Sequence, residues 1–419
     1  MYAIIDIKDR KGILLGGKEM EQLKMKIGIL PNQFLKEDGT FDKNEAIMLS
    51  GKFAGVCYDE EGFEHLVNEP VERTMRRIAR TLNDGHHSVY DHILINFNLQ
   101  NLPKILAMVL NNEHQYTTSE KSARYTPVVR KDGSIITEDE ERLYNKWLNI
   151  FKIKIKSQYG YIYNDSKIQK LAQENARYLV TVFMPTQMIY STSFRQINYI
   201  ASWMQNYIAT ANFDNDFERK LATYMNEFIE ELNNLSVLED GLLRNEKHRQ
   251  LSMFGKNLDA KEEHFGDVYS TLYKGSLAEY AQAQRHRTLD YQMEFLDKKE
   301  YYIPPIIADD QMLVDEWLGD MQTVRGVTPQ GELVKISEVG KYEDFILKCK
   351  ERLCTGAQLE IAEQTRATLL RYKKALEESG SPLAQDIQKY SHGARCTFPD
   401  FDCTSDCKFI EGKKLVRKI

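Results

Sequence analysis

The chain has 419 residues, 42% hydrophobic and 28% charged, a composition typical of a folded globular protein and unlike that of a disordered chain. This length exceeds that of one ordinary domain, so we expect more than one hydrophobic core. The 56 Lys and Arg residues against 62 Asp and Glu give a net charge of −6. That balance excludes the global positive field that drives sequence-independent nucleic-acid binding, so any anion site must be local.

Targeting and redox features point to a cytoplasmic protein. The apolar runs are far shorter than the roughly 20 residues of a membrane span, so no contact with a membrane is expected. The N-terminal stretch Met1 to Lys8 reaches charged residues before it can form the apolar segment of a signal peptide. The 6 Cys residues are too sparse for a disulfide framework, so we expect reduced thiols.

The first elements in chain order are a strand and a helix. Apolar residues alternate over Ile93–Leu99, which predicts an extended segment. A helix is expected from near Asn101 to Asn112, since Pro103 is tolerated in a first turn. A second extended segment is expected at Val182–Ser191. These segments predict an α+β protein with antiparallel strands.

Two longer helices follow from caps and periodicity. Thr137 with Glu140 forms a capping-box pattern ahead of a helix that runs to about Lys156. Apolar residues at steps of three and four predict a helix over Phe217–Leu232. The charged stretch Val237–Lys261 resembles a loop and is the best candidate for a boundary between two halves.

A basic cluster is the first candidate for chemistry. Gln282 precedes Arg285 by three residues, and His286 and Arg287 follow directly. If the segment is helical, Gln282 and Arg285 share a face. Guanidinium groups offer planar paired donors to phosphate, so the cluster suits a nucleotide. The alternative is a solvated basic helix face.

A second cluster combines an acceptor, a hydroxyl and a guanidinium. On an extended backbone Glu120, Ser122 and Arg124 point the same way, which could hold a sugar and a phosphate. The alternative is a polar loop after a helix. Downstream, Arg177 begins an apolar stretch, where a buried guanidinium would need an anionic partner.

Histidine and cysteine residues raise the question of a metal. His86, with His87 and His92 nearby, has a spacing that matches neither a zincin helix nor a zinc finger, so no metal is predicted there. The C-terminal tail could supply four zinc ligands, but their spacing is irregular and reduced surface thiols are favoured. These four residues are His392, Cys396, Cys403 and Cys407.

Taken in order, the motifs resemble those of the flavin-dependent thymidylate synthase family. The resemblance rests on His86-x-Ser88-x-x-Asp91-His92, Ser119-Glu120-x-Ser122-x-Arg124-Tyr125 and Glu174-x-Ala-Arg177. The family hallmark is Arg-His-Arg followed after seven residues by Ser, inside a pattern ending Glu-x-Ser-x-Arg-Tyr. Here the hallmark is split between two places. Ahead of Ser122, the position of Arg-His-Arg is occupied by Asn112-Glu113-His114. The intact Arg285-His286-Arg287 is followed instead by Met293, Phe295 and Asp297.

The split implies two fused copies of the family fold, an antiparallel sheet with helices, in a pseudo-dimeric chain. The expected bounds are 1–235 and 236–390, followed by a Cys-containing tail at 391–419. The copies are offset by 285 − 112 = 173 residues at the hallmark and by 325 − 177 = 148 later. The difference is assigned to the capped helix at Thr137–Lys156, extra to the first copy. The late family arginine is Arg352 in the second copy and Met204 in the first.

In the family the substrate site lies between subunits, so the resemblance implies one composite site per pair of copies. Gln282, Arg285 and Arg352 would face a second group, with Arg352 as the catalytic residue that favours the anionic uracil ring. That second group is Glu120, Ser122, Arg124 and Arg177. The implied flavin contacts are His86, Ser88, Glu120, Arg195, Arg285, His286 and Arg287.

The activity implied by the resemblance is reductive methylation of dUMP to dTMP. It would use FAD, with methylenetetrahydrofolate and NADPH as co-substrates, in a homodimer equivalent to the family tetramer. One alternative is a flavoenzyme that modifies carbon 5 of another pyrimidine nucleotide, for example by hydroxymethylation. The other is a non-catalytic nucleotide-binding homologue.

Overall fold

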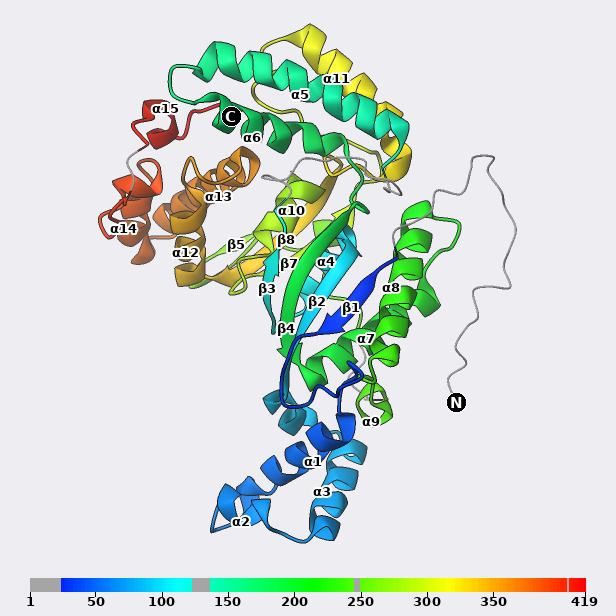
Figure 1. The fold of residues 1–419 in the computed structure, drawn as a ribbon. Coiled ribbons are helices and arrows are strands. Elements are labelled where there is room, and N and C mark those ends of the chain that lie inside the picture. Colours follow the sequence, from blue (N-terminus) through cyan, green and yellow to red (C-terminus); the bar gives the residue numbers. More distant parts are fainter. Residues whose placement is uncertain (1–23, 123–135, 245–248, 405–406) are drawn as a thin grey trace.

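The computed structural model describes residues 24–122, 136–244, 249–404 and 407–419, and it contains two four-stranded antiparallel sheets (Figure 1). The first sheet has the strand order β1-β2-β4-β3 and the second the order β5-β6-β8-β7. The strands of the first are β1 (Lys26–Ile29), β2 (Leu94–Pro103), β3 (Thr117–Glu120) and β4 (Pro185–Ser193). Those of the second are β5 (His264–Phe265), β6 (Val268–Ser276), β7 (Asp290–Phe295) and β8 (Leu333–Lys341).

Helices surround both sheets. The first half holds α1 (Lys43–Phe53), α2 (Phe63–Val67), α3 (Val71–Asn83), α4 (Lys104–Asn112), α5 (Glu138–Tyr159), α6 (Asp165–Ala176), α7 (Phe194–Thr210), α8 (Asp216–Asn234) and α9 (Asp240–Leu243). The second half holds α10 (Leu277–Ala283), α11 (Gln311–Thr323), α12 (Tyr342–Arg352), α13 (Leu359–Glu378), α14 (Leu383–Ile387) and α15 (Ile410–Lys413). Figure 1 shows α1, α2 and α3 as a projecting lobe, away from the α5, α6 and α11 layer.

Most of the elements predicted from sequence are confirmed. The Thr137 capping box is present, with the Glu140 side chain accepting from the Thr137 backbone N–H, and α5 continues past Lys156 to Tyr159. Asn215 caps α8, which covers the predicted segment. The antiparallel α+β class is also confirmed.

The predicted helix start near Asn101 is wrong. Strand β2 continues to Pro103, and α4 begins at Lys104. The register of β2 shifts between Gln100 and Leu102, where Asn101 has a φ of 55°. A bulge therefore absorbs the turn residue inside the strand, because the β4 partner continues on both sides of it.

The two sheets repeat one another in register as well as in order. Ser193 of β4 pairs with Leu94, and Lys341 of β8 pairs with Val268. The β4 and β8 positions differ by 341 − 193 = 148 residues. On the other edge, Glu120 pairs with Met188 and Met293 with Ile336, so β3 and β7 differ by 293 − 120 = 173. These are the offsets found in the sequence.

The connections repeat too, with one exception. A 3₁₀ turn begins at Arg177 before β4, and another begins at Arg325 before β8. Two helices, α5 and α6, lie between β3 and β4, whereas α11 alone lies between β7 and β8. Because α6 and α11 each lead directly into the 3₁₀ turn, α5 is the helix of the first half without a counterpart between β7 and β8 in the described residues.

The hydrophobic core crosses the expected boundary at residue 235. One buried cluster contains Ile95 and Phe97 of the first sheet together with Val334 and Ile336 of the second. A second cluster joins α5 and α6 to α11, and includes Ile419 at the C-terminus. The halves therefore share apolar surface rather than folding around separate cores. In the described ranges, no helix combines the length and apolar character that crossing a bilayer would require.

Candidate functional site

The Glu120 carboxylate lies where the two halves meet. Its Oε1 accepts from Lys104 Nζ at 2.6 Å, and its Oε2 accepts from Arg285 at 3.3 Å. Asn111 donates weakly to the same Oε2 at 3.4 Å. The Glu120 side chain is only 2% exposed. A buried carboxylate shared by two cations leaves this place with net positive charge, which favours an anionic ligand.

The segment after α10 presents the Arg-His-Arg motif as a turn and not as a helix face. Helix α10 ends at Ala283, and the Arg285 backbone N–H donates to the Gln282 carbonyl at 3.2 Å. The alternative reading of a solvated basic helix is therefore wrong for this segment. The Gln282 Nε2 is buried and has no hydrogen-bond partner in the described parts of the chain. An unpaired buried donor beside Arg285 fits an absent ligand with an acceptor oxygen.

His286 is buried between residues of its own half. Its Nε2 accepts from Arg352 Nε at 2.5 Å, and its Nδ1 lies 3.3 Å from the Glu351 carboxylate. Burial first, and then the charges of Arg352 and Lys348, lower the pKa of His286 to about 2. The imidazole is therefore neutral, with Nδ1–H toward Glu351 and Nε2 as the acceptor. This geometry holds the Arg352 guanidinium in place.

Arg287 lies over an aromatic stack. Its guanidinium carbon is 5.1 Å from the centre of the Tyr116 ring. Tyr116 stacks on Tyr190 at 5.7 Å and on His114 at 5.8 Å. Burial raises the pKa of Tyr116 while Arg287 lowers it. The Arg287 guanidinium and the stacked rings below it therefore form a flat, cationic surface, which can border a planar cofactor.

Arg177 also connects the two halves. It is 5% exposed, and its Nη2 donates to Gln358 Oε1 at 2.8 Å. The neighbouring Tyr178 hydroxyl donates to Glu360 at 2.8 Å, and Glu360 also accepts from Ser276. Burial raises the pKa of Glu360, and the bonds from Ser276 and Tyr178 lower it. Arg177 thus donates to a neutral amide oxygen, and its charge also lowers the pKa of the nearby Glu360 carboxyl.

Other predicted residues lie apart from this cluster. Arg195 forms an ion pair with Asp91 at 2.5 Å, and the Ser193 hydroxyl donates to the same carboxylate. His86 and Ser88 lie at the start of the 3₁₀ segment His87–His92, which packs against α1 and α7. No hydrogen bond or ion pair joins either of them to Arg285 in the described portions of the chain. Ser122 lies two residues beyond β3, and Arg124 falls outside the described residues.

Three positions of the opposite pairing, Asn112, Met204 and Met293, are buried in packing contacts. Asn112 donates to the Tyr291 carbonyl at 3.0 Å and accepts from the Tyr280 hydroxyl at 2.8 Å. Met204 and Met293 are buried. These contacts consume the groups that would have faced a ligand there.

Lys104 is the site residue that sequence reasoning missed. The sequence places it in a predicted first helical turn, where a lysine usually faces solvent. Only the approach of β3 to α4 brings Lys104 to Glu120, 16 residues away. Nothing in the local pattern signals this contact. No group of three or more His, Cys, Asp or Glu residues is arranged to hold a metal in the described ranges.

Comparison with known proteins finds a similarity that is limited to part of the chain. Residues 42–211 match the family model described as thymidylate synthase complementing protein. Within the first half, this chain is thus similar to flavin-dependent thymidylate synthases. Flavin-dependent thymidylate synthases of Thermococcus onnurineus and Pyrococcus furiosus are each 22% identical to it over 148 residues. The match covers 34% of this chain and 57% of each relative, so the chain spans just over half the length of those enzymes.

Solved structures with this similarity include two nucleotide complexes. A UMP/dUMP methylase PolB from Streptomyces cacaoi, bound with 5-Br dUMP, is 14% identical and covers 52% of this chain and 95% of its own, with a TM-score of 0.31. Flavin-dependent thymidylate synthase ThyX from Helicobacter pylori, complexed with FAD and dUMP, is 17% identical and covers 46% and 94%, with a TM-score of 0.28.

Proposed function

We propose that this chain is a flavin-dependent thymidylate synthase that methylates carbon 5 of dUMP to give dTMP, at one composite site per chain. The observation that carries the proposal is the Glu120–Arg285 contact, because it joins residues that the motifs assign to opposite sides of a substrate site. The match of residues 42–211 to the family model and the similarity to two flavin-dependent thymidylate synthases support the substrate class.

The repeated strand order, register offsets and 3₁₀ turns support a tandem duplication in which each copy supplies half of this site. Arg285 comes from the second copy, and Glu120 from the first. In the family this contact would join two separate subunits. Here we propose that both residues come from the same chain. By the same reasoning, we propose that a homodimer of this chain is equivalent to the family tetramer.

The substrate side of the site follows from charge and hydrogen bonding. Arg124 and Arg177 would hold the phosphate, with Ser122 donating to it. Arg352 would place positive charge beside the uracil ring and favour its anionic form. His286 orients Arg352, and the unpaired Gln282 Nε2 can donate to a ring carbonyl or ribose oxygen.

The residues around Arg287 fit a flavin. Gln284 is 1% exposed and neither amide atom has a partner in the described portions, while Tyr116 and Arg287 provide a flat, cationic border. We propose that FAD supplies the hydride there after reduction by NADPH, and that methylenetetrahydrofolate supplies the carbon. His86, Ser88 and Arg195 would contact more distant parts of the FAD.

Release of tritium from carbon 5 of labelled dUMP, with FAD, methylenetetrahydrofolate and NADPH present, tests the proposal. Activity in the native chain and its loss in Arg352→Ala, with flavin binding retained, is the expected result. Tritium release from another labelled pyrimidine nucleotide, and not from dUMP, would show that dUMP is not the substrate. A protein that binds nucleotide but never flavin would overturn the enzymatic function.

A further inference from the structure

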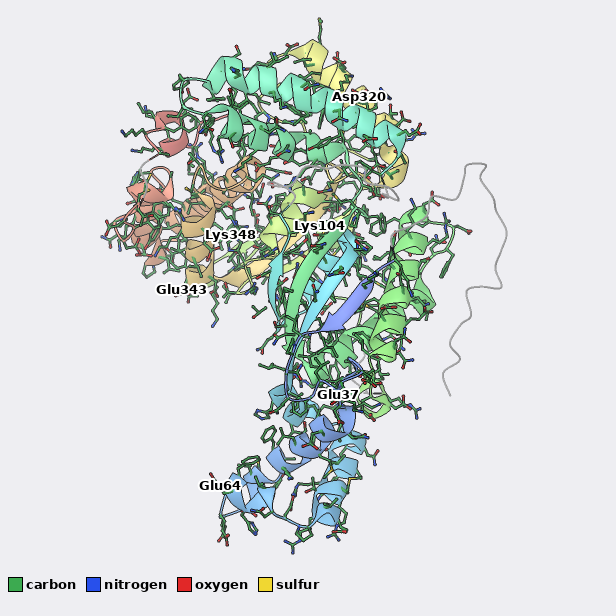
Figure 2. The ribbon with its side chains drawn as sticks, viewed as in Figure 1. Glu37, Glu64, Lys104, Asp320, Glu343 and Lys348 are labelled. Carbon is green, nitrogen blue, oxygen red and sulfur yellow. The ribbon has the colours of Figure 1, made fainter. Side chains whose placement is uncertain are left out.

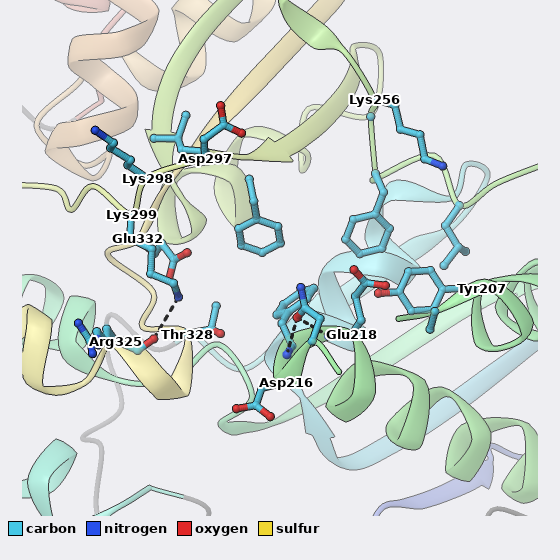
Figure 3. Close-up of a pocket in the computed structure, with 18 of the residues that line it drawn as sticks. Tyr207, Asp216, Glu218, Lys256, Asp297, Lys298, Lys299, Arg325, Thr328 and Glu332 are labelled. Carbon is cyan, nitrogen blue, oxygen red and sulfur yellow. Dashed lines mark hydrogen bonds and ion pairs between the residues drawn. The ribbon is translucent and has the colours of Figure 1, made fainter. Parts of the chain in front are cut away.

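A large cavity lies between the two halves, away from Glu120. Its volume is about 1320 Å³. The first half contributes the end of α7 and the start of α8, and the second contributes the end of β7 with the segment that follows it (Figure 3). The 3₁₀ turn at Arg325 closes one end. A cavity of this size, with polar and apolar lining, is large enough for a small organic ligand.

The cavity occupies the place that the register assigns to the second composite site. Phe295 and Asp297 are 173 positions after Ser122 and Arg124, and Arg325 is 148 after Arg177. Of the three, only Arg325 keeps the chemistry of its counterpart. An aromatic ring and a carboxylate replace the hydroxyl and one guanidinium, so the cavity would hold an anion through a different set of groups from that of the first site.

One end of the cavity is aromatic. Tyr207 and Phe254 stack with ring centres 5.4 Å apart, and Phe217 meets Phe295 edge to face at 4.8 Å. Burial raises the pKa of Tyr207, so its hydroxyl stays neutral. These ring pairs fix one another in position and present a flat apolar surface, against which a planar ligand can stack.

The other end is cationic. Figure 3 shows Lys298, Lys299 and Arg325 gathered on the side of the cavity opposite Tyr207. Lys299 is paired with Glu332 at 2.8 Å, but the side chains of Lys298 and Arg325 form no ion pair in the described ranges. Lys256, on the Tyr207 side, is likewise unpaired there.

The carboxylates of the lining are mostly engaged. Besides Glu332, Asp216 forms an ion pair with Arg219, and Glu218 accepts from the Asn212 backbone N–H at 2.8 Å. Asp297 alone has no such partner among the described residues. Lys256, Lys298 and Arg325 are the lining cations without an ion pair in the described ranges, against the carboxylates of Glu218 and Asp297, so a small excess of positive charge favours an anion.

We propose that this cavity binds a planar aromatic anion, its ring against Tyr207 and Phe254 and its charged group near Lys298 and Arg325. Nucleoside phosphates and pteridine carboxylates share that chemistry. The site is separate from the proposed active site, since it uses none of the residues that contact Glu120.

Equilibrium titration of the full chain with ATP and, separately, with folic acid tests the proposal and distinguishes the two sources. Arg325→Gln and Phe254→Ala should each weaken binding at least tenfold, whereas Arg244→Gln, which lies outside the cavity lining, should leave it unchanged. Arg325 is exposed, so its variant should fold even if Phe254→Ala does not. Absence of binding by both probes, or equal affinity in Arg325→Gln and Arg244→Gln, would overturn the site. Neither result bears on dUMP methylation.

Discussion

Glu120 and Arg285 are 165 residues apart in the sequence, yet the guanidinium lies 3.3 Å from the carboxylate. The contact joins β3 of the first sheet to the turn after α10 of the second half. Lys104, the second cation that contacts Glu120, lies at the same junction (Figure 2). A shared carboxylate of this kind ties the geometry of the proposed substrate site to the docking of the two halves.

Replacing Arg285 by Gln should weaken dUMP binding by about tenfold to a hundredfold, because a hydrogen bond to a charged group contributes about 1.5–3 kcal/mol. Calorimetric titration of the purified variants measures this. Arg244→Gln, which removes an exposed ion pair with Asp240, is the matched control and should bind normally. Equal affinity in the two variants would contradict the assignment.

Replacing Lys104 by Met should lower the free energy of unfolding by about 1–3 kcal/mol, because Glu120 is buried and would lose its shortest hydrogen bond. Urea denaturation measures the change. Lys104→Arg should recover part of it, since it restores a cation. A Met variant as stable as the native chain would show that Arg285 alone satisfies Glu120.

Stability should fall between about pH 4.5 and pH 8 because of Glu279. Burial raises the pKa of this carboxyl from 4.5 to about 8, so the folded chain keeps a proton that the unfolded chain releases. Within that window the native chain should lose about 1.4 kcal/mol per pH unit more than Glu279→Gln. Urea denaturation across the range tests this, and identical slopes would be inconsistent with a buried neutral carboxyl.

His286 should act in the opposite direction. Its folded pKa of about 2 lies below the ordinary 6.5, so below pH 6.5 the unfolded chain binds a proton that the folded chain does not. Stability that is fully present above pH 6.5 should decline as the pH falls. In His286→Gln, whose amide oxygen can still accept from Arg352, this part of the acid sensitivity should vanish. Denaturation at pH 6.5 and pH 5 compares the two chains, and an unchanged difference would refute the assignment.

Local sequence predicted the elements that local forces determine. The Thr137 capping box and the apolar periodicity of α8 depend on residues within one or two turns, and both helices form as expected. The helix start near Asn101 was wrong because pairing with β4 extends β2 to Pro103. Cross-strand hydrogen bonds, which no local pattern reports, override the turn preference of Asn101 there.

The sequence by itself determined which groups exist and in what order, including the surviving Gln282, Arg285, Glu120 and Arg177 and the offsets between the two halves. Only the tertiary structure decided what they meet: Lys104 beside Glu120, His286 beside Arg352, and a cavity in place of a second site. The reason is physical. Motif residues are specified by their own chemistry, whereas their partners are chosen by how two sheets sharing one core bring distant segments within hydrogen-bonding distance.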